Sequence, residues 1–281
     1  MSFEITLLVL LAAALNAGWN SVIKVSGDRI ASMAVVTLFG SLVSLVVLPF
    51  VGLPDPASWP LLALAILIHT AYHFALSAAY NYGDLGQVYP IARGSAPLLV
   101  TLGAFVFAGE TLGMIPLFGI IFLTAGVMAL ALDRGAGLAR NPRAVLLALG
   151  TGVFIASYTL VDGIGGRHAG SAISFAVCLT IGDGLLTFFI ALIWKAKAIS
   201  QVARSNLTPA LLAGGMQVGS YWIIIVAMAF APLGMVSALR ETSVLFAALI
   251  SSFILKEGFG VWRFVSAGMI TCGIGLTRYK P

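Results

Sequence analysis

The stretch that decides the fold class is Ala31–Val51, with the sequence ASMAVVTLFGSLVSLVVLPFV. It contains no charged residue, and it is as long as the roughly 20 apolar residues that an α-helix needs to cross a bilayer. A helix can pair all of its own backbone N–H and C=O groups, which is the condition for crossing lipid. The stretch therefore predicts a transmembrane helix.

Nine further apolar runs take up most of the remaining chain. Of its 281 residues 60% are hydrophobic and only 9% are charged, whereas soluble proteins have about 25% charged residues. We therefore expect an all-α integral membrane protein with ten transmembrane helices, and the composition excludes a soluble enzyme or a disordered chain. The predicted spans are Ile5–Lys24, Ala31–Val51, Trp59–Tyr80, Gly86–Ala108, Met114–Leu132, Ala144–Val161, Ser171–Trp194, Pro209–Phe230, Leu233–Leu255 and Val261–Thr277.

Charge and motifs exclude several functions. The 15 Lys and Arg residues form no basic cluster, which argues against nucleic acid as a partner. The chain contains no P-loop, no GxGxxG and no CxxC motif, so we expect no ATP coupling, no cofactor, no metal site and no enzyme activity. Cys178 and Cys272 lie in apolar runs, and we interpret both as small buried residues.

The links between spans predict the orientation. Most of them are very short, so consecutive helices must be antiparallel neighbours. Ten Lys and Arg residues fall on one side, in the links after spans one, five, seven and nine. The other side has Arg167, Arg278 and Lys280. The positive-inside rule then places both termini outside the cytoplasm.

The two halves of the chain resemble each other. LGQVYPIAR, which ends at Arg93, is similar to LGMVSALR, which ends at Arg240, with one extra residue in the first copy. Glu110 and Glu257 each follow their arginine by seventeen residues. Because five spans are an odd number, the second copy enters the membrane in the opposite sense. Such inverted repeats are typical of transporters that bind substrate between the repeats.

These features resemble the EamA-type permeases of the drug/metabolite transporter superfamily. The resemblance rests on the two halves of five spans, the paired Arg and Glu residues, and WNSVIK (Trp19–Lys24) at the end of the first span. It places one five-helix unit at 5–133 and another at 144–278. It implies a multi-pass transporter of the cytoplasmic (inner) membrane, usually an exporter and often driven by protons. It also implies a central cavity lined by spans one to four and six to nine.

Arg93 and Arg240 are the first candidates for a substrate site. A buried arginine costs about 2.5–3.5 kcal/mol on insertion scales, so something must offset it. Each could bind an anionic group of the substrate. Alternatively each could be structural, with Glu241 and Asp183 as counterions for Arg240.

Asp183 and the glutamates are the acidic candidates. Asp183 lies in mid-span, where a carboxyl group is either paired with a nearby arginine or protonated, and it is the candidate for carrying a coupling proton. Glu110 and Glu257 lie beside helix N-termini, where we expect them to cap free N–H groups.

Polar and aromatic side chains complete the predicted site. His69, Tyr72 and His73 share one face of span three, and we expect them to line the cavity or to bond neighbouring helices. Pro90 is expected to loosen span four. The candidate substrate-binding residues are Trp19, Asn20, His69, Tyr72, His73, Gln87, Tyr89, Arg93, Tyr158, Gln217, Tyr221, Trp222 and Arg240.

The sequence thus predicts a secondary active transporter that works by alternating access. Its expected substrate is a small metabolite, amino acid or drug, most simply an exported zwitterion or anion. Two alternatives stay open: a flippase for a lipid-linked intermediate, and a non-transporting membrane subunit that serves assembly. The expected partners are the substrate, the lipid bilayer and protons. A single chain holds both halves, so a monomer suffices, and a dimer is also compatible with the sequence.

Overall fold

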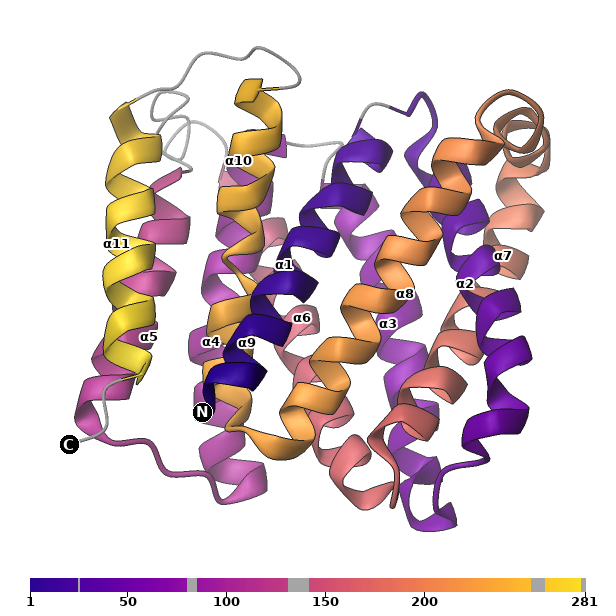
Figure 1. Ribbon diagram of the computed structural model, residues 1–281. Helices are drawn as coiled ribbons and strands as arrows, with labels where there is room; N and C mark the ends of the chain where they lie inside the picture. Colours follow the sequence, from indigo (N-terminus) through magenta and orange to yellow (C-terminus); the bar gives the residue numbers. More distant parts are fainter. Residues whose placement is uncertain (25, 80–84, 131–141, 254–260, 279–281) are drawn as a thin grey trace.

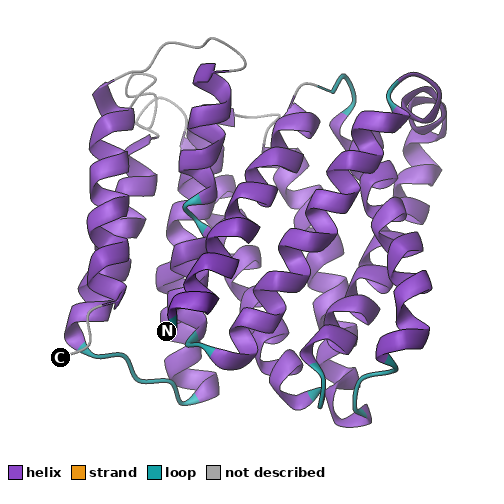
Figure 2. Ribbon diagram, in the orientation of Figure 1, coloured by secondary structure: helices purple, strands orange, loops and turns teal. Residues whose placement is uncertain are grey.

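The computed structural model describes residues 1–24, 26–79, 85–130, 142–253 and 261–278, and all regular structure in these ranges is helical (Figures 1 and 2). The helices are α1 (Phe3–Lys24), α2 (Arg29–Val51), η1 (Pro56–Ser58), α3 (Trp59–Ala79), α4 (Leu85–Ala108), α5 (Met114–Ala129), α6 (Pro142–His168), α7 (Ala172–Ser205), α8 (Leu207–Phe230), α9 (Leu233–Arg240), α10 (Ser243–Phe253) and α11 (Val261–Arg278). Within these ranges seven helices are long and apolar enough to cross a membrane. Every predicted span corresponds to a helix, with the ninth span divided between α9 and α10.

The helices stand side by side and alternate in direction. The start of α1 and the end of α11 lie at the same end of the bundle in Figure 1, together with the links that follow α2, α4, α6 and α8. The opposite end carries the links after α1 and α7. This up-and-down arrangement agrees with an even number of membrane crossings.

The ninth span was predicted as one continuous helix, and that prediction is wrong. The helix is interrupted after Arg240, about halfway along the bundle (Figure 2). The backbone N–H groups of Glu241 and Thr242 bond to carbonyls three residues back rather than four. The Thr242 hydroxyl also donates to the carbonyl of Leu239. Such tightened turns at a helix terminus satisfy groups that would otherwise be unpaired.

Pro90 was expected to loosen span four. In the structure α4 is a single helix through both Pro90 and Pro97. Pro90 lies in the second turn of α4, where its missing N–H removes one backbone hydrogen bond near the start of the helix. The two arginines that the repeat aligns therefore sit in different local structures.

Two spans extend beyond their predicted ends. Span six was predicted to end at Val161, yet α6 continues to His168. Span seven was predicted to end at Trp194, and α7 kinks there: Lys195 has non-helical dihedral angles, φ −129° and ψ 20°. The helix then continues to Ser205.

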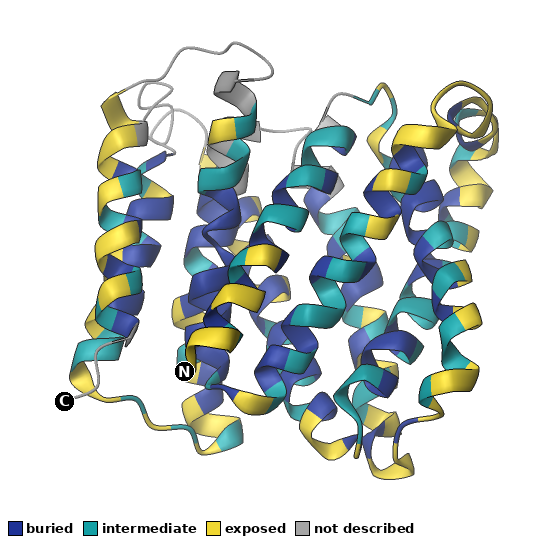
Figure 3. Ribbon diagram, viewed as in Figure 1, coloured by how far each residue is buried: buried dark blue, intermediate teal, exposed yellow. Residues whose placement is uncertain are grey.

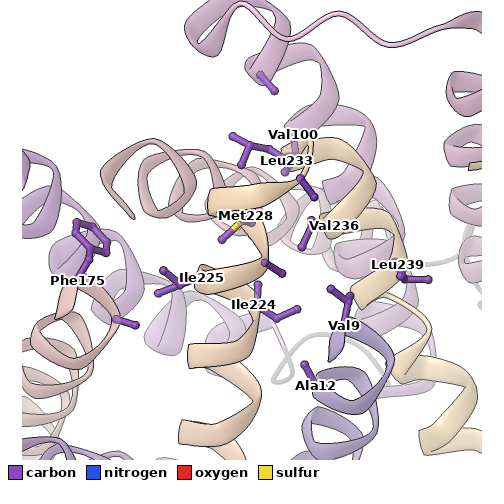
Figure 4. Packing of buried hydrophobic residues seen from close by; sticks show 14 of the residues in the cluster. Val9, Ala12, Val100, Phe175, Ile224, Ile225, Met228, Leu233, Val236 and Leu239 are labelled. Carbon is purple, nitrogen blue, oxygen red and sulfur yellow. The ribbon is translucent and has the colours of Figure 1, made fainter. Parts of the chain in front are cut away.

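Burial divides the bundle into an inner and an outer surface (Figure 3). One inner cluster joins α1, α4, α7, α8 and α9, and Figure 4 shows Val9, Val100, Phe175, Met228 and Leu233 from these helices. Large apolar side chains face outward along the helices, as expected of a lipid-facing surface. Cys272 is exposed on that surface, so its predicted burial is wrong, whereas Cys178 is half-buried.

The helix α5 packs mainly against α11 at one edge of the bundle (Figure 1). A Cβ atom at Gly119 would come within 2.8 Å of the Gly273 carbonyl oxygen, so the two backbones touch there. The GxxxG spacing of Gly109/Gly113 and Gly215/Gly219 also predicts close helix packing. The structure contradicts this prediction, because an added Cβ atom at these glycines would meet no described atom closer than 3.5 Å.

Candidate functional site

The helices line a cavity of about 70 Å³ that contains several charged and polar side chains. Its lining comes from α1–α4 and α6–α9, and within the described residues α5, α10 and α11 contribute none. This matches the arrangement that the family resemblance implied. The lining residues are Asn16, Trp19, Thr37, His69, Tyr72, His73, Arg93, Tyr158, Leu179, Thr180, Asp183, Gly184, Gln217, Val218, Ser220, Tyr221 and Arg240.

Arg93 in α4 forms a buried ion pair with Glu241. Its Nη1 lies 3.1 Å from Oε1 of Glu241, and the side chains are only 3% and 1% exposed. The pair joins two residues 148 positions apart and ties α4 to the interruption between α9 and α10. Since the carboxylate offsets the charge of the guanidinium, the structure gives Arg93 a structural partner.

Arg240, at the end of α9, has different surroundings. Its Nη2 donates a hydrogen bond of 2.9 Å to the hydroxyl of Tyr158. Its guanidinium carbon lies 5.6 Å from the ring centre of Tyr158 and 5.9 Å from that of Tyr221, within range for a cation–π interaction. Neither Glu241 nor Asp183 forms the ion pair with Arg240 that was considered from the sequence, because Glu241 pairs with Arg93 and Asp183 pairs with His73.

His69, Asp162 and Tyr221 form one hydrogen-bonded cluster. Nε2 of His69 lies 2.9 Å from Oδ2 of Asp162 and 2.6 Å from the Tyr221 hydroxyl. The Tyr221 hydroxyl also donates to Oδ2 of Asp162. The His69 ring stacks on Tyr158, with 4.1 Å between ring centres. The cluster links α3, α6 and α8, and it places the His69 ring beside the aromatic groups that flank Arg240.

A second cluster surrounds Asp183 in α7. One carboxylate oxygen lies 3.1 Å from Nε2 of His73, and the other accepts hydrogen bonds from Thr70 and Thr187. The sequence left a choice between an ion pair with arginine and a protonated carboxyl. The partner in the structure is a histidine instead, and both members of the pair line the cavity.

The remaining predicted residues divide into three groups. Trp19 lines the cavity and donates from its indole N–H to Oδ1 of Asn16. Asn20 bonds the carbonyl of Asn16, and Trp222 donates to Thr180, and neither of them lines the cavity. Gln87 and Tyr89 belong to the first turns of α4, and their side chains lie outside the described part of the structure.

Three residues of the site were missed as candidates by the sequence reasoning. Asp162 was placed beyond the end of span six, although its side chain is fully buried. Glu241 was considered only as a partner of Arg240. Asn16 was not considered, although it lines the cavity. A carboxylate within an apolar run is itself a signal, and it could have identified Asp162 had the span been extended.

The end of the bundle that carries both termini is held by Glu110 and Arg167. The Glu110 carboxylate accepts a hydrogen bond from the N–H of Leu233, the first residue of α9, and pairs with Arg167 at 2.6 Å. Arg167 also donates to the carbonyls of Met228 and Ala231. Glu110 therefore caps a helix, as predicted, and that helix belongs to the other half of the chain. Glu257 lies outside the described residues.

The opposite end has an ion pair between Asp28 and Lys195, 2.9 Å apart. Asp28 caps α2 by accepting from the N–H of Ala31, and Lys195 lies at the kink of α7. Partial burial raises the pKa of Asp28, but the hydrogen bond from Ala31 and the Lys195 ammonium outweigh it, and the net pKa is lowered. The carboxylate is therefore charged at neutral pH.

A bundle of apolar helices around a buried, charged cavity defines a multi-pass membrane protein of the transporter type. The sequence model of the EamA-like transporter family matches residues 142–279, which include Asp162, Asp183, Tyr221 and Arg240. The second half of the chain therefore matches this family, within the drug/metabolite transporter superfamily, and the resemblance found in the sequence is confirmed there.

Comparison with known proteins adds the fold. A search of curated protein sequences finds no significant match. Among solved structures 29 chains match significantly. One of them, a crystal structure described only as that of a protein, is 17% identical, with a TM-score of 0.79 over 98% of this chain and 95% of that one. At this identity the likeness shows the fold alone.

Proposed function

We propose that the protein is a secondary active transporter that moves a small metabolite by alternating access, most simply as an exporter. The observation that carries the proposal is the charged cavity, which four helices from each half of the chain build together. A buried polar space between two halves is where transporters bind their substrates. Buried charges are energetically unfavourable in a membrane, so we would not expect a bundle with a purely structural role to contain such a cavity.

The helix contacts support two inverted repeats at about 5–133 and 144–278. The contacts of α1 with α8 correspond, under the repeat, to those of α6 with α3, and both pairs pack extensively. The contacts of α4 with α6 correspond in the same way to those of α1 with α9 and α10. In this proposal the halves rock about the cavity and open it to each side in turn.

Protons are the proposed coupling ion, and the His73–Asp183 pair is their proposed carrier. The pair lies on helices of different halves, α3 and α7, and lines the cavity. A proton gained or lost here changes the charge between the halves. The protein would lie in the inner membrane with both termini outside, since the lysines and arginines concentrate at the opposite end.

The two alternatives from the sequence are less well supported. A membrane subunit for assembly predicts that the arginines are fully paired and that no cavity exists, whereas the described residues offer Arg240 no carboxylate within ion-pair distance. A flippase needs room for a lipid headgroup, and a cavity of about 70 Å³ is small for one.

Metabolite profiling of the growth medium tests the proposal. Cells express the wild type, Asp183→Asn or no protein, with membrane levels of the two proteins matched. The asparagine keeps the shape and the hydrogen bonds from the two threonines, and it removes the charge. We expect a small set of solutes to be enriched outside wild-type cells only. Identical profiles from all three cultures would contradict export.

A further inference from the structure

The two arginines that the repeat aligns are not equivalent in charge balance. Arg93 is neutralised by Glu241. Arg240 is 7% exposed, and its hydrogen bond goes to the uncharged hydroxyl of Tyr158. Within the part of the chain that the structure describes, no carboxylate pairs with Arg240. Two aromatic faces offset a buried cation only in part.

A second donor of the cavity is also unused. Asn16 is 4% exposed and lines the same cavity as Arg240. Its side-chain oxygen accepts from Trp19, and among the described residues its Nδ2 has no hydrogen-bond partner. Buried donors without partners are unfavourable. An amide N–H without an acceptor and a guanidinium without a carboxylate are the groups that would recognise an anionic oxygen.

The other charges of the site limit that anion to a single negative charge. Among the described residues Asp183 is the carboxylate that lines the cavity, and it pairs with His73. Arg93 also lines the cavity, but the buried Glu241 offsets its charge. A second negative charge on the ligand would find no second guanidinium without a carboxylate and would face Asp183. A phosphate dianion or a dicarboxylate is therefore a poor fit.

The volume limits the size of the ligand. An engineered apolar cavity of about 150 Å³ in another protein holds benzene. The cavity here is about 70 Å³, roughly half as large. In this conformation its size favours a small solute over an aromatic amino acid.

From these observations we propose that the substrate is a small aliphatic monocarboxylate whose carboxylate binds Arg240, with Asn16 as the second donor. The proposal rests on the proposed transport function and names its substrate class. It assigns the charged contact to Arg240 in the second half of the chain, because Arg93 in the first half already has its carboxylate. Two kinds of molecule carry this group: small amino acids, and small hydroxy or fatty acids without an ammonium group.

Counterflow in proteoliposomes tests the proposal, with purified full-length protein and vesicles preloaded with one unlabelled solute. One arm uses alanine, a second uses lactate, and a third uses ethanolamine as a small solute without a carboxylate. We expect uptake of labelled alanine or lactate by the wild type and none of ethanolamine. The arm that succeeds identifies the kind of monocarboxylate.

Variants then test the role of Arg240. We expect Arg240→Gln to weaken carboxylate binding at least about tenfold, because a charge-assisted hydrogen bond is lost. Arg240→Lys should retain part of the binding, since it keeps the charge. Lys197→Gln removes the same charge from an exposed site at the kinked end of α7 and should leave binding unchanged. Thermal unfolding of each variant checks that the fold is kept.

The outcomes separate this proposal from the transport function. Uptake of ethanolamine without uptake of either carboxylate would overturn the substrate class and would still support transport. Binding of a carboxylate without counterflow would support the site and contradict transport. Unchanged carboxylate uptake by a folded Arg240→Gln variant would overturn the role of Arg240. If the wild type neither binds nor moves any of the three, the substrate class is overturned, and metabolite profiling of the growth medium decides the transport function separately.

Discussion

Arg93 and Arg240 occupy matching positions of the two halves, yet they differ in their partners. Arg93 lies in a continuous helix and pairs with a carboxylate from the other half. Arg240 ends a short helix, where its guanidinium donates to the Tyr158 hydroxyl and lies beside the rings of Tyr158 and Tyr221. Two arginines that the proposed repeat aligns thus differ in their surroundings, and the partner from the distant part of the chain makes the difference.

The largest effect is expected from breaking the Arg93–Glu241 pair. Glu241→Gln leaves a buried guanidinium without its carboxylate, and removal of one partner from a buried pair costs about 3–5 kcal/mol. Thermal unfolding in nanodiscs measures the loss.

The double variant Arg93→Gln with Glu241→Gln is the matched control. It removes both charges, so it should recover part of the lost stability. Recovery is the sign of direct coupling. Two losses that simply add would show that the residues act independently.

A smaller loss of stability is expected from Arg167→Gln. This change removes the ion pair with Glu110 and the hydrogen bonds to the carbonyls of Met228 and Ala231. Because Arg167 is partly exposed, water replaces some of these bonds, and we expect a loss of about 1–2 kcal/mol. Chemical or thermal unfolding checks the value. No change would show that Arg167 does not hold this end of the bundle together.

Tyr158→Phe should change the stability of the protein little and should change its affinity for the carboxylate more. It removes the hydroxyl that accepts from Arg240 and keeps the ring that stacks on His69. We expect a stability change of about 1 kcal/mol or less and a several-fold change in carboxylate affinity. A calorimetric titration gives the affinity. An affinity equal to that of the wild type would show that the Tyr158 hydroxyl takes no part in recognition of the carboxylate.

The smallest effect on stability is expected at low pH, where protonation of Asp28 breaks its ion pair with Lys195. The pKa of Asp28 is lower in the folded protein than its ordinary value. Its contribution is therefore present at neutral pH and is lost as the pH falls below about 4, through the folded pKa. Unfolding curves of the wild type and Asp28→Asn should converge in that acidic range. A difference in stability between the two proteins that persists at acidic pH would show that Asp28 has another role.

The local pattern of the sequence was sufficient for much of the fold. Runs such as Ala31–Val51 predicted helices, since length and lack of charge alone decide whether a segment crosses lipid. Spacing also placed His69, Tyr72 and His73 on one face, and the structure brings all three to the cavity.

The partners of the charged residues could not be predicted in this way. The bond between Arg93 and Glu241 joins distant parts of the chain, and no local spacing encodes it. The interruption after Arg240 is equally non-local, because Glu241 is held by α4. Asp162 was missed because DGIGG at residues 162–166 is glycine-rich and resembles a link. In the structure this stretch is helical, and its glycines allow close approach of neighbours such as Leu233 and Phe175.

The most direct test is the carboxylate-dependent rise in melting temperature of three proteins in nanodiscs. These are the wild type, Arg240→Gln, and the double variant Arg93→Gln with Glu241→Gln. Ligands that bind only the folded state stabilise it, so the rise reports binding. We expect the carboxylate identified by counterflow to raise the melting temperature of the wild type and of the double variant, and to leave Arg240→Gln unchanged. A rise that persists in Arg240→Gln and disappears in the double variant would contradict the account, because recognition would then belong to Arg93.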